Sequence, residues 1–198
     1  MKEVVIIGAG GHGRVIADII KQSGDKVLGF LDDAETKNLP MLGRVRDCVK
    51  YKDKYVIIAI GNNEIRRRIA QQYLDLNYYT AIHPSAIISP DVKIGEGSCV
   101  MPLAVVNNAA TIGEHSIINT HATVEHDCVI GDFVHICPGA TLCGTVNVGD
   151  NTQIGAGTVV KNNINIAADC MIGVSAAVVK DIKKAGVYVG VPAREMNK

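Results

Sequence analysis

The sequence predicts a chain of two parts, a small α/β domain over residues 1–80 and a parallel β-helix over residues 81–198. Two observations lead to this fold class. An aliphatic residue recurs at every sixth position from Ile82 to Val178, and an apolar run at residues 4–7 leads directly into a glycine-rich turn. The first pattern is typical of short strands stacked in coils, and the second of the opening strand of a parallel α/β sheet.

The six-residue repeat is unbroken over seventeen consecutive positions. A period of six fits neither an amphipathic helix nor a hairpin sheet, and it indicates a short strand and a turn that repeat. Such hexads wind into a parallel β-helix whose axis is filled by the aliphatic residue. The residue two positions earlier is usually small, and the residue that follows is often Gly or Asn. We expect this Gly or Asn to adopt the unusual backbone conformation of each corner.

The first eighty residues alternate between strand and helix patterns. We expect strands at residues 2–7, 26–31 and 55–60, helices at residues 14–23 and 64–76, and a last strand at residues 78–82 that leads into the repeat. Residues 34–54 are polar and contain Pro40, so an irregular segment is expected there. The arginines of the second helix are expected on its outer face. This order of elements predicts a Rossmann-like domain.

Gly8, Gly10 and Gly13 lie between the first strand and the first helix, with the spacing of a phosphate-binding turn. Glycines let the backbone approach a phosphate, and the start of the helix supplies free N–H groups. Asp32 and Asp33 end the second strand, where this fingerprint places a contact to the sugar or the base. The simpler alternative is that the glycines only form a tight turn. Because only half of a dinucleotide fold is present, a mononucleotide-linked ligand is expected rather than NAD.

The composition argues against several classes of partner. The formal net charge is zero and no basic run occurs, which argues against nucleic acid and against a membrane surface. No segment approaches the roughly 18 apolar residues of a membrane span, and the apolar start is too short for a signal peptide. A soluble, cytoplasmic protein is therefore expected.

The six cysteines contain no CxxC pair, and a disulfide framework is not expected. Cys128 and Cys170 occupy the small inward position of the hexad, where packing in the core is the expected role. Cys137 and Cys143 lie at corners near the catalytic residues considered next, and a nucleophilic role for either is the minor alternative.

Three hexads make one coil if the coils are triangular, so residues eighteen apart stack on adjacent coils. His126 then stacks on Gly144, Asn119 on Cys137, Gly155 and Gly173, and Ala156 on Val174. A histidine base beside a glycine N–H that can stabilise an oxyanion is the arrangement that acyl transfer requires. Glu125 and Asp127 flank His126, and alternation along a strand does not decide which of them orients the imidazole.

The other histidines are expected to have different roles. His12 lies in the glycine turn and is a candidate substrate contact, whereas His83 lies at the domain junction and is expected to be structural. His115 and His121 each fall three residues after an axial residue, so both are expected to point into solvent. His135 precedes axial Ile136 and is expected to face a neighbouring subunit. No metal site is expected, because no two histidines are eighteen apart and no His–Cys cluster has zinc-like spacing.

After Val178 the repeat stops, and residues 190–194 read Gly-Val-Pro-Ala-Arg. The repeat resembles that of the hexapeptide acyltransferases, many of which close with such an element near the coenzyme A path. Asn119–Thr120, the run Glu125-His126-Asp127, Asp32–Asp33 and Gly61-Asn62-Asn63 extend the resemblance to the whole chain. With these residues the chain resembles the sugar O/N-acyltransferases of the NeuD/PglD type, and most closely the UDP-4-amino-sugar N-acetyltransferases.

The resemblance implies left-handed triangular coils, a homotrimer with active sites between subunits, and acetyl-CoA as co-substrate. It implies N-acetylation of the 4-amino group of a nucleotide-linked, UDP-type amino-dideoxy sugar, with His126 as general base, Asp127 as its partner and Gly144 as oxyanion donor. The implied acetyl-CoA contacts are His135, Gly144, Ala156 and Val174. The implied substrate contacts are Gly10, Gly11, His12, Asp32, Asp33, Gly61, Asn119 and Glu125.

Two other functions are compatible with the sequence. The first is O-acetylation of a sugar or of sialic acid without a nucleotide, which tight binding of a nucleotide to the N-terminal domain would exclude. The second is a non-catalytic β-helix scaffold, which has no need of the Glu125-His126-Asp127 motif beside a glycine.

Overall fold

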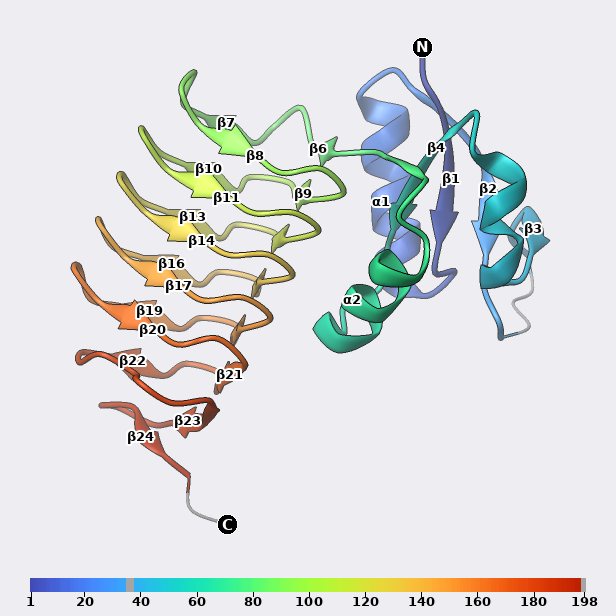
Figure 1. The fold of residues 1–198 in the computed structure, drawn as a ribbon. Helices are drawn as coiled ribbons and strands as arrows, with labels where there is room; N and C mark the ends of the chain where they lie inside the picture. The colour runs from blue at the N-terminus through green and yellow to red at the C-terminus, as the bar shows by residue number, and fades with distance from the viewer. Residues whose placement is uncertain (35–37, 197–198) are drawn as a thin grey trace.

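The computed structural model describes residues 1–34 and 38–196. Figure 1 shows an N-terminal α/β part that lies along one side of a stack of β-helical coils. The last strand of the α/β sheet ends at Tyr78, and the first strand of the coils begins at Ala81. The fold class expected from the sequence is confirmed.

The N-terminal sheet is parallel and has the strand order β3-β2-β1-β4-β5. Its elements are β1 (Glu3–Ile7), α1 (Gly11–Gln22), β2 (Lys26–Leu31), β3 (Met41–Gly43), the 3-10 helix η1 (Val45–Tyr51), β4 (Tyr55–Ile58), α2 (Asn63–Gln72) and β5 (Asn77–Tyr78). Because β2 and β4 lie on opposite sides of β1, the chain reverses direction across the sheet at β1. A parallel α/β sheet binds its ligands at such a switch point, outside the carboxyl ends of the strands.

The expectation of an irregular segment at residues 34–54 was wrong in part. β3 extends the sheet beside Phe30, and Cys48 of η1 is fully buried against it. The short apolar stretch at Met41 and Leu42 was outweighed in the sequence by the surrounding charges and Pro40. Residues 35–37, which were included in that expectation, lie outside the described residues.

The β-helix has three flat faces, and successive strands of each face pair in parallel at a register of eighteen residues up to Val178; the strand that begins at Gly186 pairs at a register of sixteen. Face 1 contains β6 (Ala81–Ile82), β9 (Cys99–Val100), β12 (Ile117–Ile118), β15 (His135–Ile136), β18 (Gln153–Ile154), β21 (Cys170–Ile172), β23 (Gly186–Val189) and the antiparallel β24 (Arg194–Glu195). Face 2 contains β7 (Ile87–Ile88), β10 (Val105–Val106), β13 (Thr123–Val124), β16 (Thr141–Leu142), β19 (Val159–Val160) and β22 (Ala177–Val178). Face 3 contains β8 (Lys93–Ile94), β11 (Thr111–Ile112), β14 (Val129–Ile130), β17 (Asn147–Val148) and β20 (Asn165–Ile166).

The interior of the coils is filled by the aliphatic and small residues of the hexads, which form one continuous core. Polar members of the small position satisfy their own hydrogen bonds inside this core. The Ser116 hydroxyl donates to the Gly131 carbonyl and accepts from the Val134 N–H. Cys128 and Cys170 are buried in the same position, as expected from the sequence. Such internal satisfaction removes the cost of burying polar groups in an apolar axis.

The corners differ from the expectation. The left-handed backbone conformation falls at every sixth residue from Gly97 to Ser175, three residues after each axial residue, with φ between 51° and 71°. The glycines that directly follow axial residues have a different role. A Cβ at Gly149 would lie 2.5 Å from the Ala168 backbone nitrogen, and one at Gly95 would lie 2.6 Å from that of Glu114. These glycines are therefore required by the close approach of adjacent coils rather than by their φ angle.

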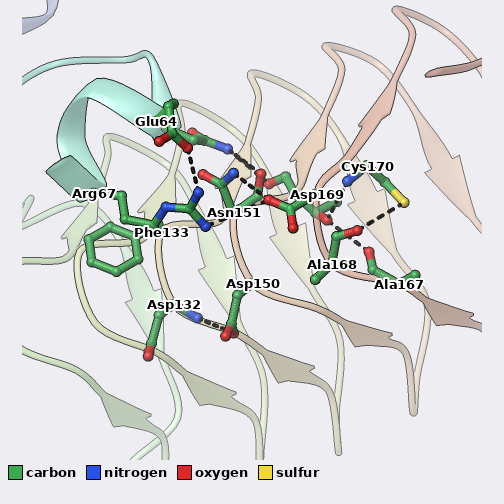
Figure 2. Close-up of polar contacts among 12 residues, drawn as sticks. Glu64, Arg67, Asp132, Phe133, Asp150, Asn151, Ala167, Ala168, Asp169 and Cys170 are labelled. Atoms are coloured by element: carbon green, nitrogen blue, oxygen red, sulfur yellow. Dashed lines mark hydrogen bonds and ion pairs between the residues drawn. The ribbon is translucent and has the colours of Figure 1, made fainter. Parts of the chain in front are cut away.

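The N-terminal domain packs against face 1 of the first coils. Cys99, Met101 and Ile117 join one apolar cluster with Ile6 and Ile16 of the α/β sheet and its first helix. Farther along the stack, α2 makes polar contacts with the corner between faces 3 and 1. Figure 2 shows Arg67 there. Its guanidinium pairs with Glu64 at 2.6 Å, and it also lies 3.7 Å from the carboxylate of Asp169 in the coil. The two parts of the chain are therefore joined by both apolar and polar contacts.

His115 does not point into solvent as expected, although His121 is exposed. The His115 ring stacks on Phe133 at 5.3 Å and meets the edge of Tyr78 at 4.4 Å, and the residue is only 4% exposed. A Cβ at Gly97 would overlap its ring, so that glycine makes room for it. The N-terminal domain packs over this corner, and the hexad pattern contains no signal for that packing.

Within the described ranges, no helix has the length and apolar content that crossing a membrane requires.

Burial lowers the pKa of His115 from 6.5 to about 4, and the charge of Arg66 adds to this effect. Between these two values the unfolded chain binds more protons than the folded chain, so stability falls as the pH is lowered through this window. We expect His115→Phe, which keeps an aromatic ring, to reduce the stability lost between pH 7 and pH 5 by on the order of 2 kcal/mol. Urea unfolding at the two pH values measures this difference. His121→Phe, at an exposed corner, is the control, and an unchanged pH dependence in His115→Phe would contradict the assignment.

Candidate active site

The glycine turn of the N-terminal domain contains glycines of two kinds. Gly8 has φ of 108°, and a Cβ there would lie 2.7 Å from the Ala59 carbonyl oxygen; a Cβ at Gly13 would overlap the Gly8 carbonyl. These two glycines are required by the protein's own packing. A Cβ at Gly10 meets nothing within 4 Å, and one at Gly11 meets only the end of Arg14. Open space above glycines at a helix start is what a phosphate cradle requires.

The acids at the end of β2 are partly engaged by the backbone. The two oxygens of Asp32 accept hydrogen bonds from the N–H groups of Ala9 and Ala34, so Asp32 braces the glycine turn. Asp33 accepts from the Val45 N–H at 3.2 Å. Both acids border a crevice of about 530 Å³ outside the strand ends. The sequence interpretation missed other polar residues that line this crevice, namely Arg44, Arg46, Arg68 and Tyr73.

His135 lies between the two parts of the chain. Its Nδ1 is 3.2 Å from the Gly61 carbonyl oxygen, and its Nε2 is 2.9 Å from the Asn119 side-chain nitrogen. The carbonyl can only accept, so Nδ1 carries the proton and Nε2 accepts from the Asn119 amide. Burial lowers the pKa of both His12 and His135 to about 4, with a further contribution from Arg66. Both rings are therefore neutral at pH 7, and His135 is covered by its own N-terminal domain rather than left open for a neighbouring subunit.

The structure decides which acid orients His126. Asp127 occupies the left-handed corner position, with φ of 58°, and this turns its side chain back toward the histidine. Its Oδ2 is 2.7 Å from Nδ1 of His126, whereas Glu125 contacts only the His126 backbone nitrogen, with its Oε2 at 3.4 Å. Because the Nδ1–H group donates its hydrogen bond to Asp127, Nε2 is the ring nitrogen that can accept a proton.

Gly144 lies directly beside the ring of His126. A Cβ at Gly144 would be 2.5 Å from His126 Nε2, so only glycine admits the ring in this position. The eighteen-residue stacking places both residues in the corner between faces 2 and 3. Among the described residues no group accepts a hydrogen bond from the Gly144 N–H. Nε2 of His126, which can accept a proton, and the N–H of Gly144, which donates to no other described group, are thus neighbours.

The predicted site residues fall into three separate places in one chain. The corner between faces 2 and 3 contains Glu125, His126, Asp127 and Gly144. The corner between faces 1 and 2 contains Asn119, Ala156 and Val174. The N-terminal domain, against face 1, contains Gly10, Gly11, His12, Asp32, Asp33 and Gly61. In a triangular coil the first corner is opposite face 1. One chain therefore does not bring His126 to the glycine turn.

The corner between faces 1 and 2 is bordered by the C-terminal hairpin. The Ala177 N–H donates to the Gly190 carbonyl, and the Ala193 N–H donates to the Ala177 carbonyl. Val174 is 73% exposed beside this hairpin, and Ala156 is half-buried one coil earlier. The residues expected to bind acetyl-CoA at this edge are therefore accessible from solvent.

The cysteines near these corners differ in accessibility. Cys137 is buried, and burial raises the pKa of its thiol to about 11, which opposes thiolate formation. Cys143 is half-buried, and its carbonyl accepts from the Cys128 thiol. Within residues 1–34 and 38–196, no group of three or more His, Cys, Asp and Glu side chains has the geometry of a metal site.

Family models match both parts of the chain. The model described as the PglD N-terminal domain matches residues 3–73, and the bacterial transferase hexapeptide model matches residues 109–144. The UDP-N-acetylbacillosamine N-acetyltransferase of Bacillus subtilis is 38% identical over 113 residues, which cover 51% of this chain and 52% of the enzyme. The chain thus spans about half the length of this curated relative.

Two solved structures match over essentially the whole chain. The acetyltransferase domain of PglB from Neisseria gonorrhoeae superposes with a TM-score of 0.94 at 34% identity, covering 99% of this chain and 100% of that domain. PerB from Caulobacter crescentus, solved with CoA and GDP-perosamine, has the same TM-score and identity and covers 100% of this chain and 98% of that enzyme. Together these matches show that the chain belongs to the PglD-type family of hexapeptide-repeat sugar acyltransferases.

Proposed function

We propose that this protein transfers the acetyl group of acetyl-CoA to the 4-amino group of a nucleotide-linked amino-dideoxy sugar, with UDP as the nucleotide. The observation that carries this proposal is the His126 ring, fixed by Asp127 on one nitrogen and lying beside Gly144 with the other. The sugar N-acetyltransferase relatives support the reaction class, and the Bacillus relative supports UDP.

His126 acts as the general base. Its Nε2 accepts a proton from the sugar amine as the amine nitrogen attacks the thioester carbonyl, and Asp127 stabilises the imidazolium that forms. When the tetrahedral intermediate collapses, the C–S bond breaks and the imidazolium returns the proton to the leaving thiolate. The products are the amide and coenzyme A thiol, so no other reactant is required.

Gly144 supplies the oxyanion donor. Its N–H is uncommitted among the described residues and lies in the same corner as the His126 ring. A donor that is already oriented costs no reorganisation as negative charge develops on the carbonyl oxygen. Ala156 and Val174 are assigned to the acetyl-CoA site with it, whereas His135, whose Nδ1 is 3.2 Å from the Gly61 carbonyl oxygen, is assigned to the nucleotide-sugar side.

The N-terminal domain binds the nucleotide sugar. The open space over Gly10 and Gly11 accommodates the diphosphate, and the crevice bordered by Asp32 and Asp33 accommodates the nucleoside. Gly61 and His12 then border the sugar, while Asn119 and Glu125 shape the acceptor pocket. This assignment makes residues 1–80 the nucleotide-sugar domain and residues 81–198 the acyltransferase domain.

The protein works as a homotrimer whose active sites lie between subunits. One chain separates His126 from the glycine turn, so a site that uses both needs a second copy. Face 2, which runs between two of the site corners, presents outward no charged side chain along its strands: Ile87, Val105, Thr123, Thr141, Val159 and Ala177. Such a face is suited to contact between copies. We place the reaction in the cytoplasm, where acetyl-CoA is available.

Thiol release from acetyl-CoA with a panel of acceptors tests the reaction. The panel contains UDP-4-amino-4,6-dideoxy-N-acetylglucosamine, a TDP-4-amino sugar, GDP-perosamine and free sialic acid. We expect fast turnover with the UDP-linked amine, because the related Bacillus enzyme is named for a UDP-linked sugar. Turnover with sialic acid alone would replace the proposal with O-acetylation.

His126→Ala is expected to lower kcat by on the order of 10²-fold or more, since the base is lost. Asp127→Asn is expected to lower kcat less, because it removes only the charge that stabilises the imidazolium. Both side chains are 58% exposed, so neither change should affect folding. Steady-state kinetics measures the loss, with His83→Ala, in an earlier coil, as a control. A rate for His126→Ala like that of the wild type would remove His126 from the mechanism.

Subunit mixing tests whether the sites are shared between copies. A Cβ at Gly11 meets no protein atom other than the end of Arg14 at 4.0 Å, so we expect Gly11→Arg to place its side chain in the open space of the glycine turn. This variant and His126→Ala are each expected to be strongly impaired alone. Co-expressed, they should regain a measurable fraction of wild-type activity, because some sites combine an intact turn with an intact His126. Mixed trimers without activity would show that each site is built within one chain.

A further inference from the structure

Arg66 of α2 is a buried cation whose nearest partners are carbonyl groups. It is 1% exposed, and none of the ion pairs among the described residues includes it. Its Nε donates to the His115 carbonyl at 2.7 Å, and its Nη2 donates to the carbonyl of Phe133 at 2.9 Å. These two carbonyls belong to consecutive coils at the corner between faces 3 and 1. Arg66 therefore holds α2 against the β-helix.

The other donors of Arg66 point into its own domain. Nη1 donates to the carbonyls of Ile60 and Gly61 at 2.8 and 3.3 Å, and Nη2 also donates to Asn63 Oδ1 at 2.9 Å. The guanidinium has five N–H groups, and five acceptors surround it. A buried charge needs this full set of partners to offset its desolvation. Loss of the side chain would leave several buried carbonyls without a donor.

The Gly61 carbonyl links Arg66 to the site. It accepts from both Arg66 and His135 Nδ1, and His135 in turn accepts from the Asn119 amide. The turn at residues 60–61 follows β4, at the switch point where the nucleotide sugar is placed. The conformation of this turn and the tautomer of His135 therefore depend on the same guanidinium.

Asn63 strengthens this junction. Its amide nitrogen donates to the carbonyls of Asn151 and Thr152 at 3.2 Å, while its oxygen accepts from Arg66. Arg67, the next residue on α2, also reaches the coil, where it lies 3.7 Å from Asp169 (Figure 2). Among the described residues it has no hydrogen bond or ion pair to the turn or to His135. Of these two arginines of α2, Arg66 joins the coil to the turn, whereas Arg67 contacts the coil surface and Glu64 of its own helix.

We infer that Arg66 is a positioning residue of the nucleotide-sugar site: it fixes the turn at residues 60–61, and with it His135, against the corner of the β-helix. This inference rests on the proposed function for the identity of the ligand. Arginine is required because its planar, five-donor group reaches carbonyls on both sides of the junction, whereas a lysine ammonium has three donors at one point.

The test compares Arg66→Gln and Arg66→Lys with Arg67→Gln as the matched control. In Arg66→Gln we expect KM for the nucleotide sugar to rise about tenfold or more, with KM for acetyl-CoA within about twofold of the wild type. Arg66→Lys should show a smaller rise in the same KM, and Arg67→Gln should resemble the wild type. A purely structural role would instead reduce the amount of active enzyme, and leave both KM values unchanged.

A second readout needs no ligand. NMR of isotope-labelled histidine reports the tautomer and the pKa of His135 in the free protein. Burial and Arg66 lower this pKa to about 4 in the wild type. In Arg66→Gln we expect the Nδ1–H tautomer to lose its dominance and the pKa to move toward 6.5, with no change in Arg67→Gln.

Each outcome decides the inference. Equal rises in both KM values, or unchanged KM values and His135 signals in a folded Arg66 variant, would overturn it. If Arg66→Gln does not fold, the same measurements on Arg66→Lys decide. If the wild type acetylates no nucleotide sugar, the proposed function fails, while the His135 spectra still show whether Arg66 positions the turn.

Discussion

The eighteen-residue register between successive coils is the constraint on which the rest of the structure depends. From Ala81 to Val178, the strands of the β-helix pair with the strand one coil away at this register, as Thr123 does with Thr141. A continuous hydrogen-bond ladder on three faces leaves no freedom for one coil to slip against the next. Each corner therefore becomes a fixed column of residues. The pairing of His126 with Gly144 is one such column, and its geometry follows from the ladder rather than from any contact special to the site.

This constraint explains why so much could be predicted from the sequence. The axial position, the small position and the stacking of residues eighteen apart are all properties of the local repeat. These properties alone suffice to place His126 beside Gly144 and Asn119 next to Cys137. The choice between Glu125 and Asp127 remained open because alternation along a strand does not decide it. The left-handed residue was expected directly after the axial position. The structure places it two residues later, at Asp127, and this turns that carboxylate toward the imidazole.

Two of the incorrect expectations, those for His115 and Arg66, concern contacts between the two parts of the chain. His115 has the same hexad position as exposed His121, but its ring is covered by Tyr78 of the N-terminal domain and stacks on Phe133 of the next coil. Arg66 was expected on the outer face of its helix with the other arginines. A signal against this was present, because Asn63, Arg66, Ile69 and Ala70 share one helical face, and the structure buries all four. An apolar residue with this spacing would have been predicted to be buried. Because Arg66 is charged, it was expected on the outer face instead.

The division of the site between domains determines what the junction must achieve. The column of His126 and Gly144, which we propose to be catalytic, is fixed by the hydrogen-bond ladder, but the glycine turn is held on a separate domain. Any error in how that domain docks is therefore carried to the substrate. Apolar contact between Ile16 and the first coils stabilises docking but is non-directional, so it tolerates small shifts. The hydrogen bonds of Arg66 and Asn63 to coil carbonyls are directional and buried, and they are lost if the domain slides. A fully satisfied polar junction at α2 is thus the part of the interface that can fix the substrate turn relative to the coils.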